Sequence, residues 1–320
     1  MKKILANDGI SKEGKNKLEQ AGYIVVTENV AQENLAETIN KEGYVALLVR
    51  SATTVRKELI DACPGLKFIG RGGVGMDNID VEYARSKGVF VTNTPEASSQ
   101  SVAELAMGSL FALARSTFDS YKEMPLQGES NFGSLKKKYS KGVELRGKTL
   151  VIIGFGRIGQ SLAAYALGVG MKVIGVTRSS KEYQIPIEIE GAGEISVTIT
   201  TTSDLDDALS KADFITMNVP KQSNGQALIT KTEFAKMKDG VRIVNVARGG
   251  VINEDDLLEA LDSGKVAAAA VDVFVNEPNP RKDLVSDTKV ASTPHIGAST
   301  NEAQSRIGIE LANLIIKTLG

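Results

Sequence analysis

Short runs of apolar residues alternate with longer amphipathic stretches along the first hundred residues. The apolar runs predict strands at 3–7, 23–27, 45–49, 66–70 and 89–92. The stretches between them, as at 12–21 and 33–41, have the spacing of helices. Repeated strand and helix units of this kind are typical of a parallel sheet with helices on both faces.

A second alternating series begins at Lys148. Before it lie an apolar helix at 98–114 and a polar stretch at 117–147, which shows little periodicity and contains lysines that we interpret as a solvated face. A closing helix is predicted at 300–319. The pattern therefore indicates two doubly wound α/β units. The strands predicted in the second series lie at 149–153, 172–176, 214–218, 242–246 and 267–271.

A glycine-rich segment follows the apolar strand at the start of the second series and precedes a helix. It contains Gly154, Gly156 and Gly159, with Arg157 and Ile158 between them. Glycines at this spacing permit a tight turn and close approach of the backbone to a pyrophosphate, and the helix N-terminus supplies positive potential. Because strand, glycines and helix occur in the expected order, we predict dinucleotide binding; a simple turn is the alternative.

The residues after the next strand bear on the choice of cofactor. A carboxylate for the adenosine ribose is expected about 20 residues beyond the glycines, but the chain has Thr177, Arg178, Ser179 and Ser180 there. Without a carboxylate a 2′-phosphate is not repelled, and Arg178 offers it a charge-assisted contact. Alternatively, Arg178 faces solvent or stacks on adenine, and Thr177 accepts the ribose of NAD. We expect NAD, with NADP as the alternative.

One segment interrupts the alternation of strands and helices. Isoleucines alternate with polar residues on both sides of Gly191-Ala192-Gly193, which predicts a hairpin over 185–199. It falls where a doubly wound fold ordinarily passes quickly into a helix. We interpret it as an element near the adenosine end of the nucleotide site or as a subunit contact.

Composition excludes several classes of function. The chain has 38 Lys and Arg against 39 Asp and Glu, so no net field draws it to nucleic acid or to an anionic membrane. One cysteine, Cys63, and one histidine exclude an internal disulfide and leave no ligand set for zinc. The N-terminus lacks the apolar core of a signal peptide, and no run of about 18 apolar residues occurs. We therefore expect a cytoplasmic protein without a metal site.

The lone histidine, His295, is the first candidate for proton transfer, because histidine is the side chain best suited to exchange protons near neutral pH. A half-buried structural histidine is the alternative. The segments 244–250, 271–278 and 293–298, taken with the glycine-rich segment, resemble the D-isomer-specific 2-hydroxyacid dehydrogenases over nearly the whole chain. The resemblance implies a Rossmann-type dinucleotide-binding domain, 98–291, inserted into a flavodoxin-like substrate domain, 1–97 plus 292–320.

The resemblance also implies three catalytic residues. Oxidation of a 2-hydroxy acid requires a base at the hydroxyl, which His295 would provide; Glu277 would orient the imidazole, and Arg248 would bind the substrate carboxylate by a forked contact. Asp272 is similar to the family's aspartate near the nicotinamide, with a strand-end cap as the alternative. Arg248, Asp272 and His295 are also expected to contact the cofactor. The further cofactor contacts expected are Val219, Pro220, Val246, Ala247, Gly297 and Ala298.

The segments 48–53 and 70–80 look like the family's substrate loops. Arg50 resembles the arginine that helps to hold phosphate in members acting on 3-phosphoglycerate in serine biosynthesis, whereas Ser98 stands where those members commonly have asparagine. We expect a phosphorylated 2-hydroxy or 2-keto acid, namely 3-phosphoglycerate or 3-phosphohydroxypyruvate, as the substrate. A reductase of glyoxylate or hydroxypyruvate is the alternative, and a non-catalytic dinucleotide sensor or corepressor is a third possibility from another class. The expected substrate contacts are Arg50, Ser51, Gly73, Val74, Gly75 and Ser98.

The family resemblance extends to assembly. Members are usually homodimers joined through the nucleotide-binding domain, so we expect a homodimer, with the apolar helix at 98–114 as suitable contact material. The chain ends at Gly320, shortly after the closing helix. We therefore do not expect the C-terminal regulatory domains of longer relatives, or feedback by serine through them.

Overall fold

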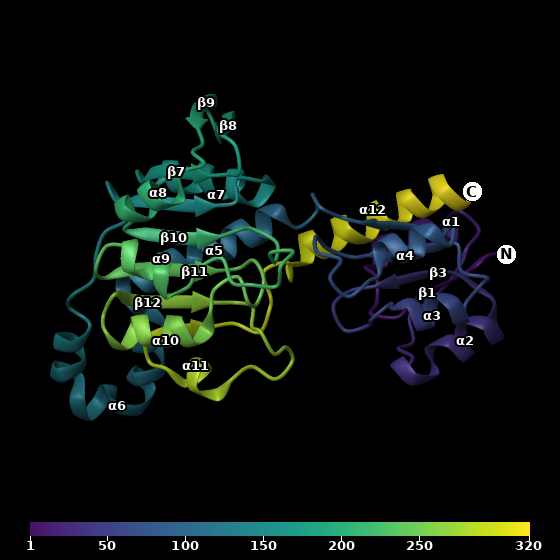
Figure 1. The fold of residues 1–320 in the computed structure, drawn as a ribbon, viewed down its shortest axis with the longest axis horizontal. Coiled ribbons are helices and arrows are strands. Elements are labelled where there is room, and N and C mark those ends of the chain that lie inside the picture. Colours follow the sequence, from purple (N-terminus) through teal and green to yellow (C-terminus); the bar gives the residue numbers. More distant parts are fainter. The chain divides into compact units, whose positions relative to one another are not determined.

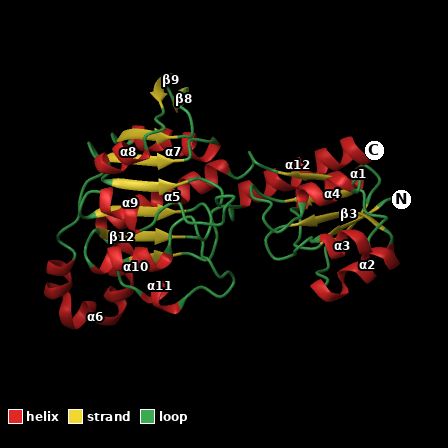
Figure 2. Cartoon of the chain, viewed as in Figure 1, coloured by secondary structure: helices red, strands yellow, loops and turns green.

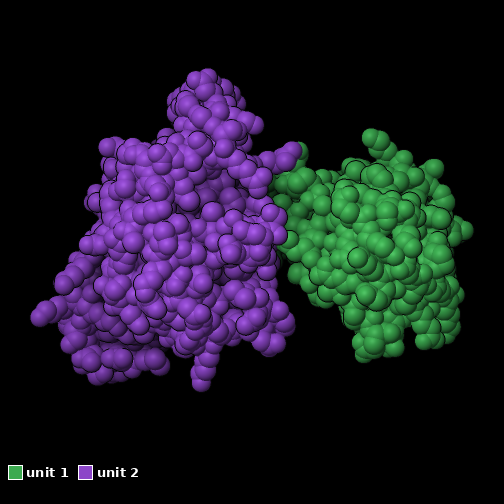
Figure 3. All heavy atoms as spheres, in the orientation of Figure 1, with its two compact units in different colours: residues 1–101, 298–320 green, residues 102–297 purple.

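The computed structural model describes residues 1–320, which form two compact units (Figure 3). Unit 1 comprises Met1–Ser101 and Ala298–Gly320, and unit 2 comprises Val102–Gly297, so unit 2 is inserted into the sequence of unit 1. The second crossing between the units lies after Gly297, beyond the boundary at 291/292 drawn from the sequence. The reason is a short strand at Val290–Ser292, β13, which pairs with β12 (Val266–Val271) of unit 2.

Unit 1 is a five-stranded parallel sheet in the order β2-β1-β3-β4-β5. Successive residues of β3 face opposite sides: Leu47 packs with the helices α2, α3 and α4, and Leu48 packs with α1 and α12. Both faces of the sheet are therefore covered (Figure 1). The elements are β1 (Lys3–Ala6), α1 (Lys12–Gln20), β2 (Ile24–Val26), η1 (Gln32–Asn34), α2 (Leu35–Glu42), β3 (Tyr44–Val49), α3 (Lys57–Ala62), β4 (Phe68–Arg71), α4 (Val81–Ser86), β5 (Phe90–Asn93) and α12 (Asn301–Leu319).

Unit 2 is a six-stranded parallel sheet in the order β13-β12-β11-β10-β6-β7, again between two layers of helices (Figure 2). One face packs against α5 and α7, and the other against α8, α9, α10 and α11. The remaining elements are α5 (Ser99–Arg115), α6 (Thr117–Lys138), β6 (Thr149–Ile153), α7 (Arg157–Gly168), β7 (Lys172–Val176), α8 (Leu205–Lys211), β10 (Phe214–Met217), α9 (Lys231–Lys236), β11 (Val241–Asn245), α10 (Glu254–Asp262) and α11 (Lys282–Ser286).

The stretch with little periodicity contains a helix, α6, interrupted by a kink at Asn131. Leu135 is the buried residue of this helix, whereas the side chains of Tyr121 and Leu126 are 75% and 79% exposed. Apolar residues of α6 therefore do not gather on one buried face, so the helical period is weak in the sequence. No helix of the chain combines the length and apolar character needed to cross a membrane.

The hairpin predicted over 185–199 forms as β8 (Glu182–Ile189) and β9 (Gly193–Thr200), which pair antiparallel. It projects beyond β7 at the edge of the unit 2 sheet (Figure 1). Near its root Ile185 and Ile199 are buried, while Ile195 near its tip is 51% exposed. The root is thus part of the core of unit 2, and the tip is a solvent-exposed ribbon.

Candidate active site

His295 and Glu277 form a hydrogen-bonded pair in unit 2. The Oε2 atom of Glu277 lies 2.7 Å from Nδ1 of His295, and its Oε1 atom accepts a hydrogen bond from the N–H of Phe274 at 2.9 Å. Both side chains of the pair are 34% exposed. Because Glu277 occupies Nδ1, the imidazole presents Nε2 as the nitrogen that can exchange a proton with a ligand.

The backbone at His295 has a φ of 53°, in the left-handed region that non-glycine residues rarely adopt. Asp272, 3% exposed at the end of β12, holds this turn. Its carboxylate accepts hydrogen bonds from the Thr293 hydroxyl at 2.6 Å and from the N–H groups of Ile296 and Gly297 at 2.8 and 2.9 Å. These contacts are those of a strand-end cap, the alternative role considered for Asp272. Its carboxylate holds the segment that carries the histidine.

Arg248 lies on the loop after β11, beside the segment that carries Glu277. The side chain of Asn245 shapes this loop, since it accepts from the N–H of Ala247 at 3.1 Å and donates to the carbonyl of Arg248 at 3.2 Å. A β-carbon at Gly249 would overlap the carbonyl oxygen of Phe274. The three predicted catalytic residues therefore come from loops at the carboxyl ends of β11, β12 and β13, which are neighbours in the sheet.

The glycine-rich segment has the shape of a pyrophosphate cradle. Gly154 has a φ of 94°, and a β-carbon there would lie 2.7 Å from Cγ1 of Val219. Helix α7 begins directly after Gly156, which gives it no side-chain cap, and no atom lies within 4 Å of a β-carbon built at Gly156. Open space beside uncapped N–H groups fits a dinucleotide phosphate. Of the other expected contacts, Arg157 and Pro220 are exposed, Ile158 and Ala298 are half-buried, and Gly159, Val246 and Ala247 are buried.

The hairpin root meets the segment after β7. The hydroxyl of Thr177 donates to the carbonyl of Ser179 at 2.8 Å and lies 2.8 Å from the hydroxyl of Thr201 at the end of the hairpin. Tyr183 of β8 packs edge-on against Phe155 of the glycine-rich segment, with ring centroids 5.2 Å apart. The hairpin root thus lies beside the segment after β7, where the adenosine end of the cofactor is expected. Its role there, or in a subunit contact, stays a prediction.

Unit 1 carries the predicted substrate loops, and two polar residues outside the predicted set hold the first of them. Oδ2 of Asp8 accepts from the N–H groups of Arg50 and Thr53 at 2.6 and 3.1 Å. The amide of Asn78 donates to the carbonyls of the same two residues at 2.7 and 2.6 Å. The backbone around Arg50 is therefore fixed, and the neighbouring Ser51 is exposed. Both contacts join segments distant in sequence, so no local pattern pointed to them.

Arg71 is a candidate that the sequence prediction omitted. It ends β4 and is the register partner of Val49, next to Arg50 at the end of β3. Its guanidinium occupies the space where a side chain at Gly73 would lie, and Cγ of Arg50 would be 3.6 Å from a β-carbon at Gly72. The two arginines thus border the loop that contains Gly72 and Gly73.

The remaining predicted substrate residues of unit 1 differ in exposure. Val74 is 37% exposed and Gly75 is half-buried. Ser98 is 1% exposed, and its hydroxyl has no hydrogen-bond partner.

Comparisons with known proteins agree with this arrangement. The family model described as "D-isomer specific 2-hydroxyacid dehydrogenase, NAD binding domain" matches residues 107–297. A hydroxypyruvate reductase from Thermotoga maritima is 44% identical over 99% of this chain and 98% of its own. A D-3-phosphoglycerate dehydrogenase from Methanocaldococcus jannaschii is 42% identical over the whole chain, which spans 58% of that relative's length.

The fold comparison leads to the same group of proteins. The solved structure of a glyoxylate reductase from Paecilomyes thermophila superposes with a TM-score of 0.81 at 28% identity, covering 99% of this chain and 95% of that one. The family model spans more than half of the chain, and the relatives above 40% identity cover nearly all of it. The chain therefore belongs to the D-isomer specific 2-hydroxyacid dehydrogenases, a family of NAD-dependent oxidoreductases.

Proposed function

We propose that this protein is a D-3-phosphoglycerate dehydrogenase, which interconverts 3-phosphoglycerate and 3-phosphohydroxypyruvate. The observation that carries the proposal is the pair of arginines, Arg50 and Arg71, at the ends of neighbouring strands beside Gly72 and Gly73. Guanidinium groups bind phosphate by forked, charge-assisted hydrogen bonds. The identity of 42% with the Methanocaldococcus enzyme supports the same substrate.

The proton transfer belongs to the His295–Glu277 pair. When bound, a nicotinamide cofactor would supply the acceptor for the hydride that leaves C2 of the substrate during oxidation. Nε2 of His295 accepts the proton of the C2 hydroxyl, and the same nitrogen returns a proton to the carbonyl oxygen during reduction. Glu277, 2.7 Å from Nδ1, keeps that nitrogen protonated and stabilises the imidazolium that forms.

Arg248 binds the substrate carboxylate in this proposal. Its guanidinium carries a permanent charge, and its planar fork matches the two oxygens of a carboxylate. The loop that carries it packs against the loop that carries Glu277, through the close approach at Gly249. The carboxylate contact and the proton-transfer pair are therefore held in one fixed relation within unit 2.

NAD(H) is the cofactor that we propose, held by the glycine-rich segment. The family model for an NAD binding domain covers this segment, and Gly154 and Gly156 fit a dinucleotide phosphate. NADP is the alternative, because Arg178, Ser179 and Ser180 are exposed where a ribose-binding carboxylate is expected. Thr177 is another proposed cofactor contact. Its hydroxyl donates a hydrogen bond to the carbonyl oxygen of Ser179.

A substrate panel tests the phosphate assignment. Wild-type protein should reduce 3-phosphohydroxypyruvate with a kcat/KM far above that for hydroxypyruvate or glyoxylate. Arg50→Met removes the guanidinium but keeps a flexible apolar stem, and it should lower kcat/KM for the phosphorylated substrate by about a hundredfold. Hydroxypyruvate should be affected by less than about twofold. Arg56→Met, which removes an exposed arginine paired with Asp80 in the same unit, is the matched control.

A hydroxypyruvate reductase is the second candidate. The 44% identity with the Thermotoga enzyme, over nearly the full length of both chains, favours it. Equal kcat/KM for hydroxypyruvate and 3-phosphohydroxypyruvate, together with no selective effect of Arg50→Met, would replace the first assignment with this one.

We further propose that the enzyme acts in the cytoplasm as a homodimer and serves serine biosynthesis. Support for the dimer comes from apolar side chains that unit 2 leaves exposed on α5 and α6. Phe111 is 47% exposed and Phe132 is 59% exposed. Such side chains are material for an interface between copies. Light scattering should give a mass twice that of the 34.0 kDa chain.

A further inference from the structure

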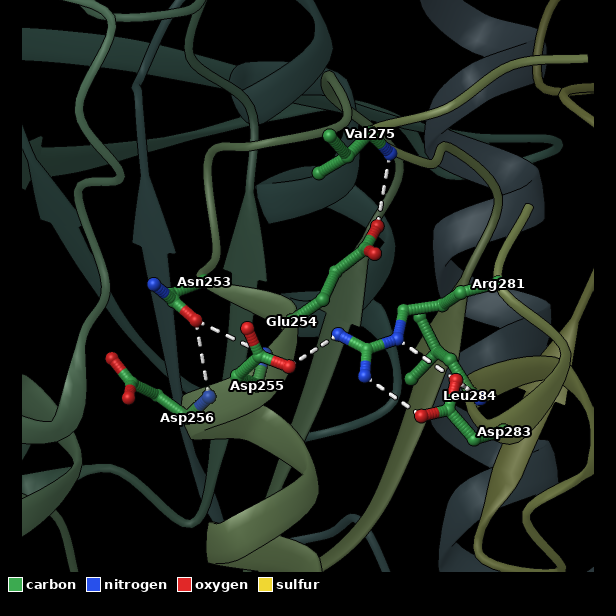
Figure 4. Close-up of polar contacts among 8 residues, drawn as sticks. All are labelled: Asn253, Glu254, Asp255, Asp256, Val275, Arg281, Asp283 and Leu284. Carbon is green, nitrogen blue, oxygen red and sulfur yellow. Dashed lines mark hydrogen bonds and ion pairs between the residues drawn. The ribbon is translucent and has the colours of Figure 1, made fainter. Parts of the chain in front are cut away.

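Glu254 stands at the start of α10, but its side chain does not cap the helix (Figure 4). Asn253 already caps this helix, because its side-chain oxygen accepts from the N–H groups of Asp255 and Asp256 at 3.0 and 3.1 Å. The carboxylate of Glu254 instead extends out of the helix, and its Oε1 atom accepts a hydrogen bond from the N–H of Val275 at 2.9 Å. This contact fixes the backbone two residues before Glu277.

The other end of the same segment is tied to the same helix turn. Nη1 of Arg281 lies 2.5 Å from Oδ1 of Asp255, and its Nε and Nη2 atoms make a forked pair with Asp283 at 2.8 and 2.7 Å (Figure 4). The carboxylates of Asp283 and Asp255 raise the pKa of Arg281 above its ordinary value. The loop from Val275 to Arg281 is therefore anchored on both sides of Glu277.

Two consecutive N–H groups of this loop each meet a carboxylate. The N–H of Phe274 donates to Oε1 of Glu277, and the N–H of Val275 donates to Glu254. The same peptide rests on Gly249, where a β-carbon would lie 2.7 Å from the nitrogen of Val275. The peptide between Phe274 and Val275 is thus held by packing against Gly249 and by the hydrogen bond to Glu254.

We propose that Glu254 is a positioning residue for the Glu277–His295 pair. By holding the N–H of Val275, it keeps the adjacent N–H of Phe274 aimed at Oε1 of Glu277, so that Oε2 remains on Nδ1 of the histidine. The inference rests on the function proposed above for that pair. It assigns to Glu254 no contact with substrate or cofactor.

Three substitutions at Glu254 test this role in the full-length protein. Glu254→Ala removes the acceptor and should lower kcat by about ten- to a hundredfold, because small displacements of catalytic groups are costly. The KM for the keto acid and the dissociation constant of NADH should stay within about twofold. Glu254→Gln keeps an oxygen for the N–H of Val275 and should restore kcat to within about threefold of wild type. Glu259→Ala, on the same helix and paired with Lys231, is the matched control.

His295 provides a direct spectroscopic readout, because the imidazole signals of the protein in NMR belong to this one residue. In Glu254→Ala these signals should move toward their positions in Glu277→Gln, which weakens the pair itself. They should keep their wild-type positions in Glu254→Gln and Glu259→Ala. A Glu254→Ala protein with wild-type kcat and wild-type imidazole signals would overturn the proposal. Equal losses of kcat in the Ala and Gln variants would overturn it as well.

Glu254→Asp replaces Glu254→Ala as the test variant if the alanine variant does not fold. The shorter side chain keeps a negative charge at the start of α10, where it is favourable, but withdraws the carboxylate from Val275. Its kcat should fall and its imidazole signals should move in the direction of Glu277→Gln; unchanged values of both would reject the positioning role. The NMR readout requires no turnover, so a wild-type protein without dehydrogenase activity would refute the proposed function and still leave this test decisive.

Discussion

Two places along the carboxyl side of the unit 2 sheet differ in how their side chains are held. The chemical end follows β11, β12 and β13, and the adenosine end follows β7. After β11, β12 and β13 the polar side chains are committed to one another, as in Glu277 with His295 and Asp272 with the turn that carries His295. After β7, by contrast, the charged side chain of Arg178 is exposed. In the proposed function, the chemical step would be served by side chains that are in place before any ligand binds, while the choice of cofactor would depend on an exposed arginine.

His295→Ala should break the chemical end and leave the other intact. Loss of the base should lower kcat by about a thousandfold, within the range usual for general acid–base catalysis. The dissociation constant of NADH, measured by fluorescence titration, should change by less than about twofold, because the pyrophosphate contacts expected of the glycine-rich segment do not involve the His295 side chain. A parallel loss of NADH binding would show that the two ends are not independent.

Gly249→Ala should disturb the chemical end through packing alone. The new β-carbon must displace the peptide between Phe274 and Val275. We expect a loss of about 1–3 kcal/mol in the free energy of unfolding, typical of overpacking, and a fall in kcat of about tenfold. Gly168→Ala at the end of α7, where no atom lies within 4 Å of the added carbon, is the control and should not destabilise the protein. A variant at Gly249 as stable and active as wild type would contradict the close packing of the two loops.

Arg178→Ala should act at the adenosine end only, without an effect on kcat or on the free energy of unfolding. If the guanidinium meets a 2′-phosphate, KM for NADPH should rise by about tenfold, the equivalent of one charge-assisted hydrogen bond. KM for NADH and kcat with either cofactor should not change. Lys172→Ala, an exposed cation at the opposite end of β7, is the control. No change in either KM would remove Arg178 from the cofactor site.

What the sequence predicted well depends on neighbours along the chain. The hairpin and the strands of both sheets, except the short β13, could be predicted because periodicity is local. The cradle could be predicted because Gly154, Gly156 and Gly159 lie on one turn. The carboxylates that hold these loops in place could not be predicted. Asp8 reaches Arg50 and Glu254 reaches Val275 across long stretches of sequence, and an acidic residue after a strand or in a first helical turn is common for local reasons. Helix α6 was not predicted, because its apolar residues do not recur at the spacing of one buried helix face.

The insertion of unit 2 into unit 1 has a consequence for the order in which the chain folds. Ile307, Leu311 and Ile315 of α12 cover one face of the unit 1 sheet, packing with Leu48 and Phe68, yet the ribosome makes them after all of unit 2. Unit 2 is contiguous and can fold as it emerges, whereas unit 1 must wait with an apolar face uncovered. A nascent chain that lacks α12 therefore has a complete unit 2 and a unit 1 whose apolar sheet face is uncovered.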